Sequence, residues 1–155
     1  MTESAWQVRA LEPRDLPQVV SIQQACPEAA QWSAADYEPA AGRGVYCLIA
    51  DQQGRIGGFL AGRVAHDQFE ILNLAVREEC RRAGIATQLL NQALGYAAAK
   101  ARQAFLEVRP SNRAARQFYA RHGFVQAGRR RAYYANPVED ALILARGLGA
   151  GETAR

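Results

Sequence analysis

An apolar run, a basic turn and an amphipathic segment follow one another at residues 71–97. Residues 71–76 are almost entirely apolar and indicate a strand. After the turn, helical spacing brings apolar side chains onto one face: Ile85, Leu89, Ala93, Leu94 and Ala97. The sequence therefore predicts a strand that leads through residues 81–84 into a helix, and a fold in which a sheet and helices pack together.

The turn combines several features of an anion-binding site. The first turn of a helix has backbone N–H groups without intrahelical partners, and the helix dipole adds partial positive charge there. Gly84 has no Cβ and lets a ligand approach the backbone, while Arg81 and Arg82 add cationic charge. We expect a phosphorylated ligand here, most naturally a diphosphate. The alternative is an ordinary surface turn with two solvated arginines.

The spacing of the turn excludes two common phosphate-binding motifs. No Lys-Ser or Lys-Thr pair follows Gly84, as a P-loop requires, and the G-x-G-x-x-G pattern of dinucleotide-binding folds is absent. The motif is instead Arg81-x-x-Gly84-x-Ala86.

Periodicity and turn residues predict the other elements. Strands are expected at residues 6–11, 45–51, 56–65, 69–76, 104–108, 124–134 and 141–145. Helices are expected at residues 13–26, after Ser33 around Asp36 and Tyr37, at 84–102 and at 111–122. The order β-α-α-β-β-β-α-β-α-β-β predicts an α/β (α+β) fold. We expect a mixed, mostly antiparallel central sheet with helices on both faces, in which residues 45–76 form an antiparallel meander.

Length and composition describe the setting. At 155 residues we expect a single domain at residues 1–146 and a flexible tail at 147–155. No apolar run is long enough for a membrane span, no secretory signal is visible, and the net charge of +4 includes no dense basic tract for nucleic acid. The dispersed cysteines, Cys26, Cys47 and Cys80, lack metal-ligand spacing and suggest a reducing compartment. We therefore expect a cytoplasmic protein without a metal, and the role of residues 28–44 stays open.

Glu107 lies in the middle of the apolar run at residues 104–108. A buried carboxylate is costly unless it is satisfied, and desolvation favours its neutral form. Glu107 is therefore a candidate general base. The alternative is that its side chain lies on a solvated face or pairs with an arginine. Glu70 is the second candidate, although a solvated carboxylate is the more common finding at a strand end.

Other residues near these motifs have two interpretations each. Asn112 can cap the helix that follows or contact a ligand. Tyr119 can be a core aromatic residue or a proton donor. Cys80 lies near the basic turn, but no histidine is close to it in sequence, so we interpret it as structural.

These motifs together resemble the RimI branch of the GNAT acetyltransferase superfamily. The pattern Arg81-x-x-Gly84-x-Ala86 is similar to the acetyl-CoA signature (Q/R)-x-x-G-x-(G/A) of that superfamily. The RimI-like features are Trp32-Ser33, Leu106-Glu107-Val108-Arg109-Pro110-Ser111-Asn112, Phe118-Tyr119 before Gly123-Phe124, Arg131-Ala132-Tyr133-Tyr134 and Glu139-Asp140-Ala141. The resemblance covers residues 6–145, nearly the whole chain. Residues 40–44 match nothing in the family.

The resemblance implies an activity and a set of ligand contacts. Enzymes of the RimI branch acetylate the N-terminal alanine of the eighteenth small-subunit ribosomal protein. It implies a GNAT fold, acetyl-CoA as cosubstrate, direct transfer through a ternary complex, and a monomer or weak dimer that acts on a protein N-terminus. The CoA diphosphate would be held by Arg81, Arg82, Ala83, Gly84, Ile85, Ala86 and Thr87. The pantetheine would lie along Leu74, Ala75 and Val76 and contact Asn112.

The resemblance also implies catalytic roles. Glu107 would be the general base, acting through water, and Tyr119 would contact the cofactor and return a proton to the CoA thiolate. Tyr133, Tyr134 and Arg109 would lie near the peptide N-terminus. An α-amino group has a pKa near 8 and lysine one near 10.4, so an N-terminus costs roughly 3 kcal/mol less to deprotonate. Two alternatives stay open: a GNAT enzyme for a small amine or a lysine side chain, and a non-catalytic acyl-CoA-binding module.

Overall fold

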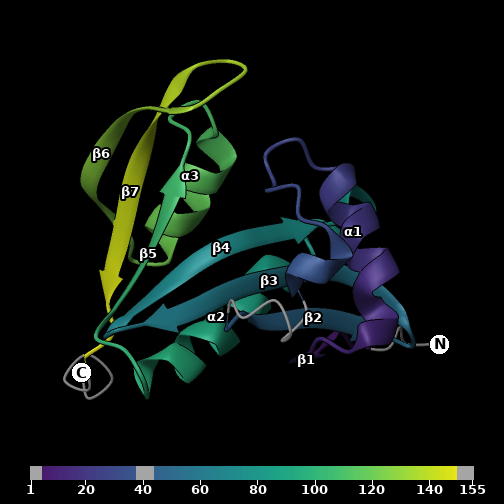
Figure 1. Ribbon diagram of the computed structural model, residues 1–155. Helices are drawn as coiled ribbons and strands as arrows, with labels where there is room; N and C mark the ends of the chain where they lie inside the picture. The colour runs from purple at the N-terminus through teal and green to yellow at the C-terminus, as the bar shows by residue number, and fades with distance from the viewer. Residues whose placement is uncertain (1–4, 38–43, 150–155) are drawn as a thin grey trace.

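The computed structural model describes residues 5–37 and 44–149 as one sheet with helices on both faces (Figure 1). The strands are β1 (Gln7–Ala10), β2 (Tyr46–Gln52), β3 (Arg55–Ala65), β4 (Gln68–Val76), β5 (Gln103–Val108), β6 (Val125–Tyr134) and β7 (Glu139–Gly147). The α-helices are α1 (Leu16–Gln24), α2 (Ile85–Ala98) and α3 (Arg113–Arg121). Short 3-10 helices are η1 (Pro13–Asp15), η2 (Ala34–Tyr37) and η4 (Glu78–Cys80).

The sheet is mixed and mostly antiparallel, as predicted. Its strand order in the described residues is β1-β2-β3-β4-β5-β7-β6. Strands β2, β3 and β4 form the predicted antiparallel meander. Strands β4 and β5 are parallel, and α2 provides the crossover connection that parallel neighbours need.

Two hydrophobic clusters lie on opposite faces of the sheet. On one face, α1 buries Val19 and Ile22 against Ile49 and Phe59 of the meander. On the other face, α2 buries the stripe that its spacing predicted: Ile85, Leu89, Ala93, Leu94 and Ala97. We call these the α1 cluster and the α2 cluster. Helices therefore cover both faces, which confirms the predicted fold.

Strands β4 and β5 pair over a short length and then separate. Their register joins residues 68–70 of β4 to residues 103–105 of β5. Beyond these residues, β4 continues toward α1 while β5 runs alongside β7 (Figure 1). We call the two diverging segments, residues 71–76 and 106–108, the β4–β5 fork.

A bulge in β4 lies at the start of this fork. Ala61 of β3 faces Asn73, whereas the next residue, Gly62, faces Ile71, so Leu72 is the extra residue. A bulge of this kind changes which side chains point to which face. Ile71 accordingly belongs to the α2 cluster, and Ala75 belongs to the α1 cluster.

The structure differs from the prediction at some element boundaries. The helix expected after Ser33 is the single 3-10 turn η2, and η4 was not predicted. Helix α2 ends at Ala98, before the predicted end at residue 102, because the N–H groups of Lys100 and Ala101 both bond to the carbonyl of Ala97 and close the helix.

The C-terminal boundary lies later than predicted. Gly147 is the last residue of β7, and Leu148 is buried in the α2 cluster with its N–H donating to the Arg102 carbonyl at 2.7 Å. These contacts hold both residues in the folded domain. The rest of the predicted tail, at 150–155, lies outside the described residues, as do residues 1–4 and 38–43. In the part of the chain that the structure describes, no helix has the length and apolar character to cross a membrane.

Candidate active site

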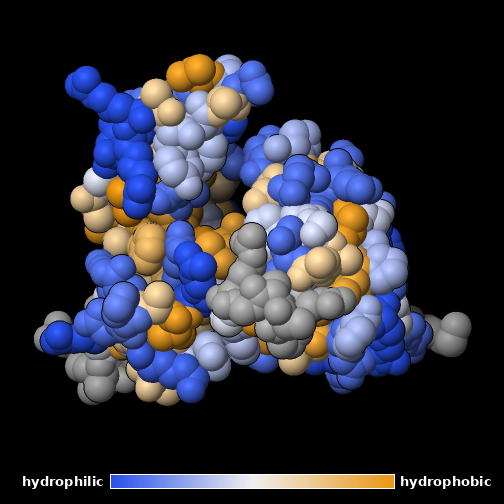
Figure 2. All heavy atoms as spheres, viewed as in Figure 1, coloured by the Kyte–Doolittle hydropathy of each residue, from blue (hydrophilic) through white to orange (hydrophobic). Residues whose placement is uncertain are grey.

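The predicted motifs meet around the β4–β5 fork. The turn at residues 81–84 joins η4, which follows β4, to α2; Glu107 lies on β5, and Asn112 is the N-cap of α3. On one side of the sheet the molecular surface is hollowed between the β6–β7 part and the part around α1 (Figure 2). The fork therefore lies between a predicted anion site and a predicted base.

The turn before α2 exposes its backbone. Arg81, Arg82, Ala83 and Gly84 are exposed, and Ile85 is the first buried residue after them. Arg82 has a φ of 69° and Gly84 a φ of 79°, so two left-handed residues precede the helix. Left-handed residues next to right-handed ones turn successive N–H groups to one side and form an anion-binding nest.

The start of α2 lacks a side-chain cap. Gly84 is its N-cap residue, and the first helical turn contains no acidic side chain. A Cβ added at Gly84 would meet no heavy atom within 4 Å, so the space beside the backbone is open. The first N–H groups of α2 are therefore available to an anion, and these features fit the predicted diphosphate.

Helix α3 stands beside this turn. Its N-cap Asn112 accepts a hydrogen bond through Oδ1 from a backbone N–H in the first turn at 3.2 Å, which confirms the cap interpretation. At the other end of α3, His122 Nε2 lies 3.3 Å from Thr87 Oγ1 in the first turn of α2. Burial and the charges of Arg121 and Arg146 lower the pKa of His122, so its ring is neutral near pH 7.

Glu107 faces away from α2 and α3. Its neighbours Ala104, Leu106 and Val108 are buried in the α2 cluster, so strand alternation directs Glu107 to the opposite face. The side chain is 12% exposed, and Oε1 lies 3.0 Å from Nε of Arg130 on β6. Of the alternatives that the sequence left open, the arginine pair is present.

Glu70, the second candidate base, lies on the same face. It is the partner of Phe105 in the last parallel pair between β4 and β5. Its Oε1 lies 3.3 Å from Nη2 of Arg63. Because Glu70 lies where the strands still pair and Glu107 lies where they have separated, Glu107 is the carboxylate of the fork.

Two tyrosines at the end of β6 lie close to Glu107. Tyr133 lies close enough to Glu107 to interact with its carboxylate, and this interaction together with burial raises the pKa of Tyr133. Burial and the charge of Glu107 raise the pKa of Tyr134 to about 12. Both phenols therefore keep their protons near pH 7, and half of the Tyr133 side chain is accessible beside the carboxylate.

Arg109 holds the loop that follows these tyrosines. Its guanidinium donates to the carbonyls of Pro137 at 3.0 Å and Ala135 at 3.1 Å, and it lies 3.3 Å from Glu139. It also lies 4.3 Å from the ring centroid of Tyr134. The sequence predicted a substrate contact for Arg109, but these bonds go to the β6–β7 loop, so we assign Arg109 to positioning Tyr134.

Tyr119 lies on the opposite side of β5, inside the α2 cluster. Its ring centroid is 5.1 Å from Phe118 and 5.3 Å from Phe124. Burial raises its pKa well above the ordinary range, so the hydroxyl is protonated near pH 7. Its hydroxyl forms no hydrogen bond within the described residues. Every fully buried side-chain oxygen in that part of the chain has a hydrogen-bond partner, so this hydroxyl is in contact with solvent. The ring is a core residue, and the hydroxyl stays free to donate.

A buried polar network ties the segment after α1 to β4. Asn73 accepts a hydrogen bond from the Ala30 N–H at 3.1 Å and donates to the Ala30 carbonyl at 2.9 Å and to Tyr37 Oη at 3.3 Å. Tyr37 donates to Gln23 Oε1 at 2.5 Å, and Gln23 donates to the Trp32 carbonyl. Residues 29–37 are therefore fixed against β4 just beyond the bulge, as one wall beside the fork.

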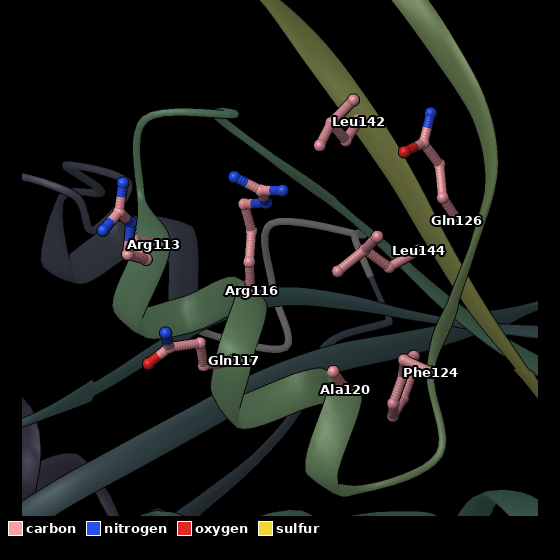
Figure 3. A pocket seen from close by; sticks show the side chains of 8 residues that line it. All are labelled: Arg113, Arg116, Gln117, Ala120, Phe124, Gln126, Leu142 and Leu144. Carbon is pink, nitrogen blue, oxygen red and sulfur yellow. The ribbon is translucent and has the colours of Figure 1, made fainter.

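A cavity of about 550 Å³ lies elsewhere, between α3, β6 and β7 (Figure 3). Its lining residues are Arg113, Arg116, Gln117, Ala120, Phe124, Gln126, Leu142 and Leu144. A second cavity, of about 510 Å³, lies between β1 and α2, beside Trp6 and Gln88. Neither contains a predicted catalytic or cofactor residue, so the fork is the candidate active site.

The described residues contain no group of three or more His, Cys, Asp or Glu side chains placed to hold a metal ion. Cys80 is buried in the α2 cluster, in agreement with its structural interpretation. Burial also raises the pKa of Cys47 to about 12, so this thiol is not a nucleophile.

Three residues of this site escaped the sequence reasoning. Arg130 meets Glu107 through the register of β5, β7 and β6. Asn73 and His122 meet partners 43 and 35 residues away in sequence. The polar Asn73 inside an apolar strand was the one available signal, because a buried amide needs hydrogen-bond partners.

Comparison with known proteins identifies relatives with the same fold. Residues 7–124 match the model of the Acetyltransferase (GNAT) family. The chain is 31% identical over 141 residues to the ribosomal protein bS18-alanine N-acetyltransferase of Escherichia coli, an alignment that spans 89% of this chain and 95% of that protein. The crystal structure of the ribosomal-protein-S18-alanine N-acetyltransferase from Escherichia coli superposes with a TM-score of 0.80 at 30% identity, over 93% of this chain and 94% of that one.

Two further relatives match over shorter stretches. One is a Bacillus subtilis protein provisionally named as a bS18-alanine N-acetyltransferase, which is 33% identical over 98 residues. The other is an uncharacterized N-acetyltransferase of Methanocaldococcus jannaschii, which is 37% identical over 98 residues. The chain spans 65% and 62% of the lengths of these two proteins, less than two thirds of each.

Proposed function

The chain belongs to the GNAT family of acetyltransferases and is an N-acetyltransferase, and from this premise we propose that its acceptor is the N-terminal α-amino group of a protein. Family membership implies acetyl-CoA as the acetyl donor. The relationship to the Escherichia coli enzyme supports a ribosomal acceptor, and we propose the N-terminal alanine of a small-subunit ribosomal protein. The observation that carries the proposal is Glu107, held beside the β4–β5 fork and next to two tyrosines.

We assign donor binding to the turn and the fork. The open N–H groups at residues 82–87 and the charges of Arg81 and Arg82 suit the two phosphates of CoA. On β4, residues Leu74–Val76 lie beyond the last pair with β5, where backbone groups can bond the amides of an extended pantetheine. Asn112 uses Oδ1 in its cap, and its Nδ2 has no partner among the described residues, which leaves it for the pantetheine arm.

We assign proton removal to Glu107. The acceptor amine forms a C–N bond with the thioester carbonyl carbon while the C–S bond breaks, and Glu107 takes the amine proton through a water molecule. A positioned general base contributes on the order of 10²–10⁴-fold to the rate. A backbone N–H within Leu74–Val76 stabilises the charge that develops on the carbonyl oxygen.

We assign proton return to Tyr119. Its hydroxyl donates to the departing CoA sulfur and regains a proton from solvent, which its oxygen reaches. Burial of its ring keeps the phenol protonated near pH 7, so a proton is available to the thiolate as the C–S bond breaks. The chain's own residues supply the base, the acid and the oxyanion donor, and no covalent enzyme intermediate is needed.

An α-amine is the acceptor that suits this arrangement. A protein N-terminus has a pKa about 2.5 units below that of lysine, which lowers the cost of deprotonation by roughly 3 kcal/mol. A single carboxylate, ion-paired with Arg130, can then serve as the base. Tyr133 and Tyr134 flank Glu107 and offer ring surfaces to the first residues of a peptide.

Mass spectrometry of peptides incubated with acetyl-CoA tests the acceptor. The panel contains a ribosomal peptide with N-terminal alanine, the same peptide with a blocked N-terminus, and a peptide with an internal lysine. We expect acetylation of the free α-amine only. Acetylation of the internal lysine would indicate another acceptor class, and so would acetylation of a small amine such as spermidine when it replaces the peptide in the reaction. Acetyl-CoA binding without any turnover would indicate a non-catalytic acyl-CoA-binding module.

Variants of the proposed base and the proposed acid test the site. We expect Glu107→Gln and Tyr119→Phe each to lower kcat at least tenfold while the dissociation constant for acetyl-CoA stays within twofold. Glu70→Gln is the matched control, since it alters a carboxylate on the same face, and it should leave kcat within twofold. Normal turnover by both Glu107→Gln and Tyr119→Phe would refute the assignment of the site.

A further inference from the structure

Arg130 reaches Glu107 from two strands away. Arg130 faces Ala141 across the β6–β7 pair, and Glu107 faces Ile143 across the β5–β7 pair. Strand β7 therefore lies between the two residues, and the small side chain of Ala141 lets the long arginine pass over that strand. The resulting contact joins Arg130 Nε to Glu107 Oε1 at 3.0 Å.

The side chains of Arg130, Tyr133 and Glu107 each lie next to the other two. The Arg130 guanidinium carbon lies 5.7 Å from the ring centroid of Tyr133, and Tyr133 lies close enough to Glu107 for the two side chains to interact. The terminal torsion of a glutamate side chain is broad, so an isolated carboxylate rotates over a wide range. The ion pair with Arg130, and Tyr133 beside it on β6, restrict that rotation. An ionised carboxylate has about four lone-pair sites, so donors remain possible on the side of the fork.

The contact has little consequence for folding. The Arg130 side chain is 57% exposed, whereas that of Glu107 is 12% exposed. An ion pair with one solvated partner contributes little to protein stability. The contact can still fix the orientation of the less mobile, buried partner. Its removal should therefore alter catalysis without unfolding the protein.

We propose that Arg130 is the positioning residue of the general base: its guanidinium, ion-paired with Glu107, holds the carboxylate in the orientation that accepts the acceptor's proton. This inference rests on the function proposed for Glu107. Arg130 acts through Glu107 and touches neither acetyl group nor thiol. A double-mutant cycle between the two residues isolates this dependence, because a residue that acts only through another has no effect once the other is removed.

The experiment measures kcat and KM of the full-length enzyme with the alanine peptide and acetyl-CoA, by the release of the CoA thiol. The variants are Arg130→Gln, Arg130→Lys, Glu107→Gln and the Arg130→Gln/Glu107→Gln double variant. Arg131→Gln is the matched control, because Arg131 is the next residue, is exposed, and has no ion pair or hydrogen bond among the described residues. Far-UV circular dichroism and the acetyl-CoA dissociation constant show that each variant is folded.

We expect Arg130→Gln to lower kcat about tenfold with the KM for acetyl-CoA within twofold. Arg130→Lys should recover part of the loss, since it restores the positive charge without the planar guanidinium. In the Glu107→Gln background, Arg130→Gln should change kcat less than twofold, and Arg131→Gln should resemble the parent enzyme.

Three results would overturn the inference. Arg130→Gln could keep kcat within twofold. It could raise kcat, as expected if Arg130 obstructs the base, or it could lower kcat by the same factor with and without Glu107. A full rate for Glu107→Gln alone is a separate result. It removes the proposed base, and with it the basis of this inference, whatever Arg130→Gln does.

Discussion

The Asn73→Ala substitution tests the network that fixes residues 29–37 beside the fork. Asn73 is 5% exposed and makes three hydrogen bonds, two with the Ala30 backbone and one with Tyr37. Alanine removes all three and leaves the Ala30 N–H and carbonyl buried without their partner. The substitution should therefore lower the free energy of unfolding and release residues 29–37 from their fixed position against β4.

The magnitude follows from the number of bonds. A hydrogen bond contributes about 1 kcal/mol net to stability, so the three bonds predict a loss of about 3 kcal/mol in the free energy of unfolding. For a chain of this length, that loss corresponds to a fall in Tm of roughly 6–12 °C. Tyr37→Phe removes the bond shared with Asn73 and the bond to Gln23, so we expect about 1–2 kcal/mol.

Urea denaturation followed by circular dichroism measures these losses. Asn91→Ala is the control, because Asn91 is an exposed residue of α2 where alanine is tolerated. The double variant Asn73→Ala/Tyr37→Phe should lose less than the sum of the single losses, since one bond is counted in both. A loss below 1 kcal/mol for Asn73→Ala, or strict additivity with Tyr37→Phe, would refute the reasoning. In the folded variant, KM for the peptide should rise while acetyl-CoA affinity is retained.

Three further predictions concern the turn, the β6–β7 loop and pH. Gly84→Ala places a Cβ on a residue with φ 79°, which costs about 1–2 kcal/mol, and calorimetry should show weaker acetyl-CoA binding; unchanged affinity would contradict a role for this backbone. Arg109→Leu removes the bonds to Pro137 and Ala135, so KM for the peptide should rise several-fold. Arg109→Lys should not restore KM, because lysine lacks the planar guanidinium, and a normal KM in steady-state kinetics would contradict this prediction. The folded-state pKa of His122 lies below its ordinary value of 6.5, so the unfolded chain takes up a proton first as pH falls. The free energy of unfolding should therefore decline from pH 7 to pH 5, and denaturation of His122→Gln should show a smaller decline.

The elements of the fold were predictable because their signals are local. The helix spacing of Ile85, Leu89 and Ala93 predicts the buried face of α2 from one segment alone. Asn112 could be assigned as a cap because an N-cap side chain and the N–H that donates to it lie within one helical turn. The antiparallel meander and the mixed sheet followed from the order of elements along the chain and the family resemblance.

The arrangement of the site was less predictable because it depends on register. The contact between Glu107 and Arg130 exists because β7 pairs with both of their strands in one alignment. The bulge at Leu72 and the end of the β4–β5 pairing leave no pattern in the sequence. The family resemblance suggested a substrate contact for Arg109, and nothing in the local sequence indicated the loop carbonyls that bind it, which are 26 and 28 residues away.

The short β4–β5 pairing also divides the sheet mechanically. Within the described residues, three parallel residue pairs join the half that contains β1 to β4 with the half that contains β5 to β7. Each half has long antiparallel ladders of its own. A force or a thermal fluctuation that separates the halves is opposed by those few pairs and by the packing of α2, whereas the long ladders keep each half intact. The line along which a substrate would lie is thus also the compliant seam of the molecule, and amide exchange should be fastest along it.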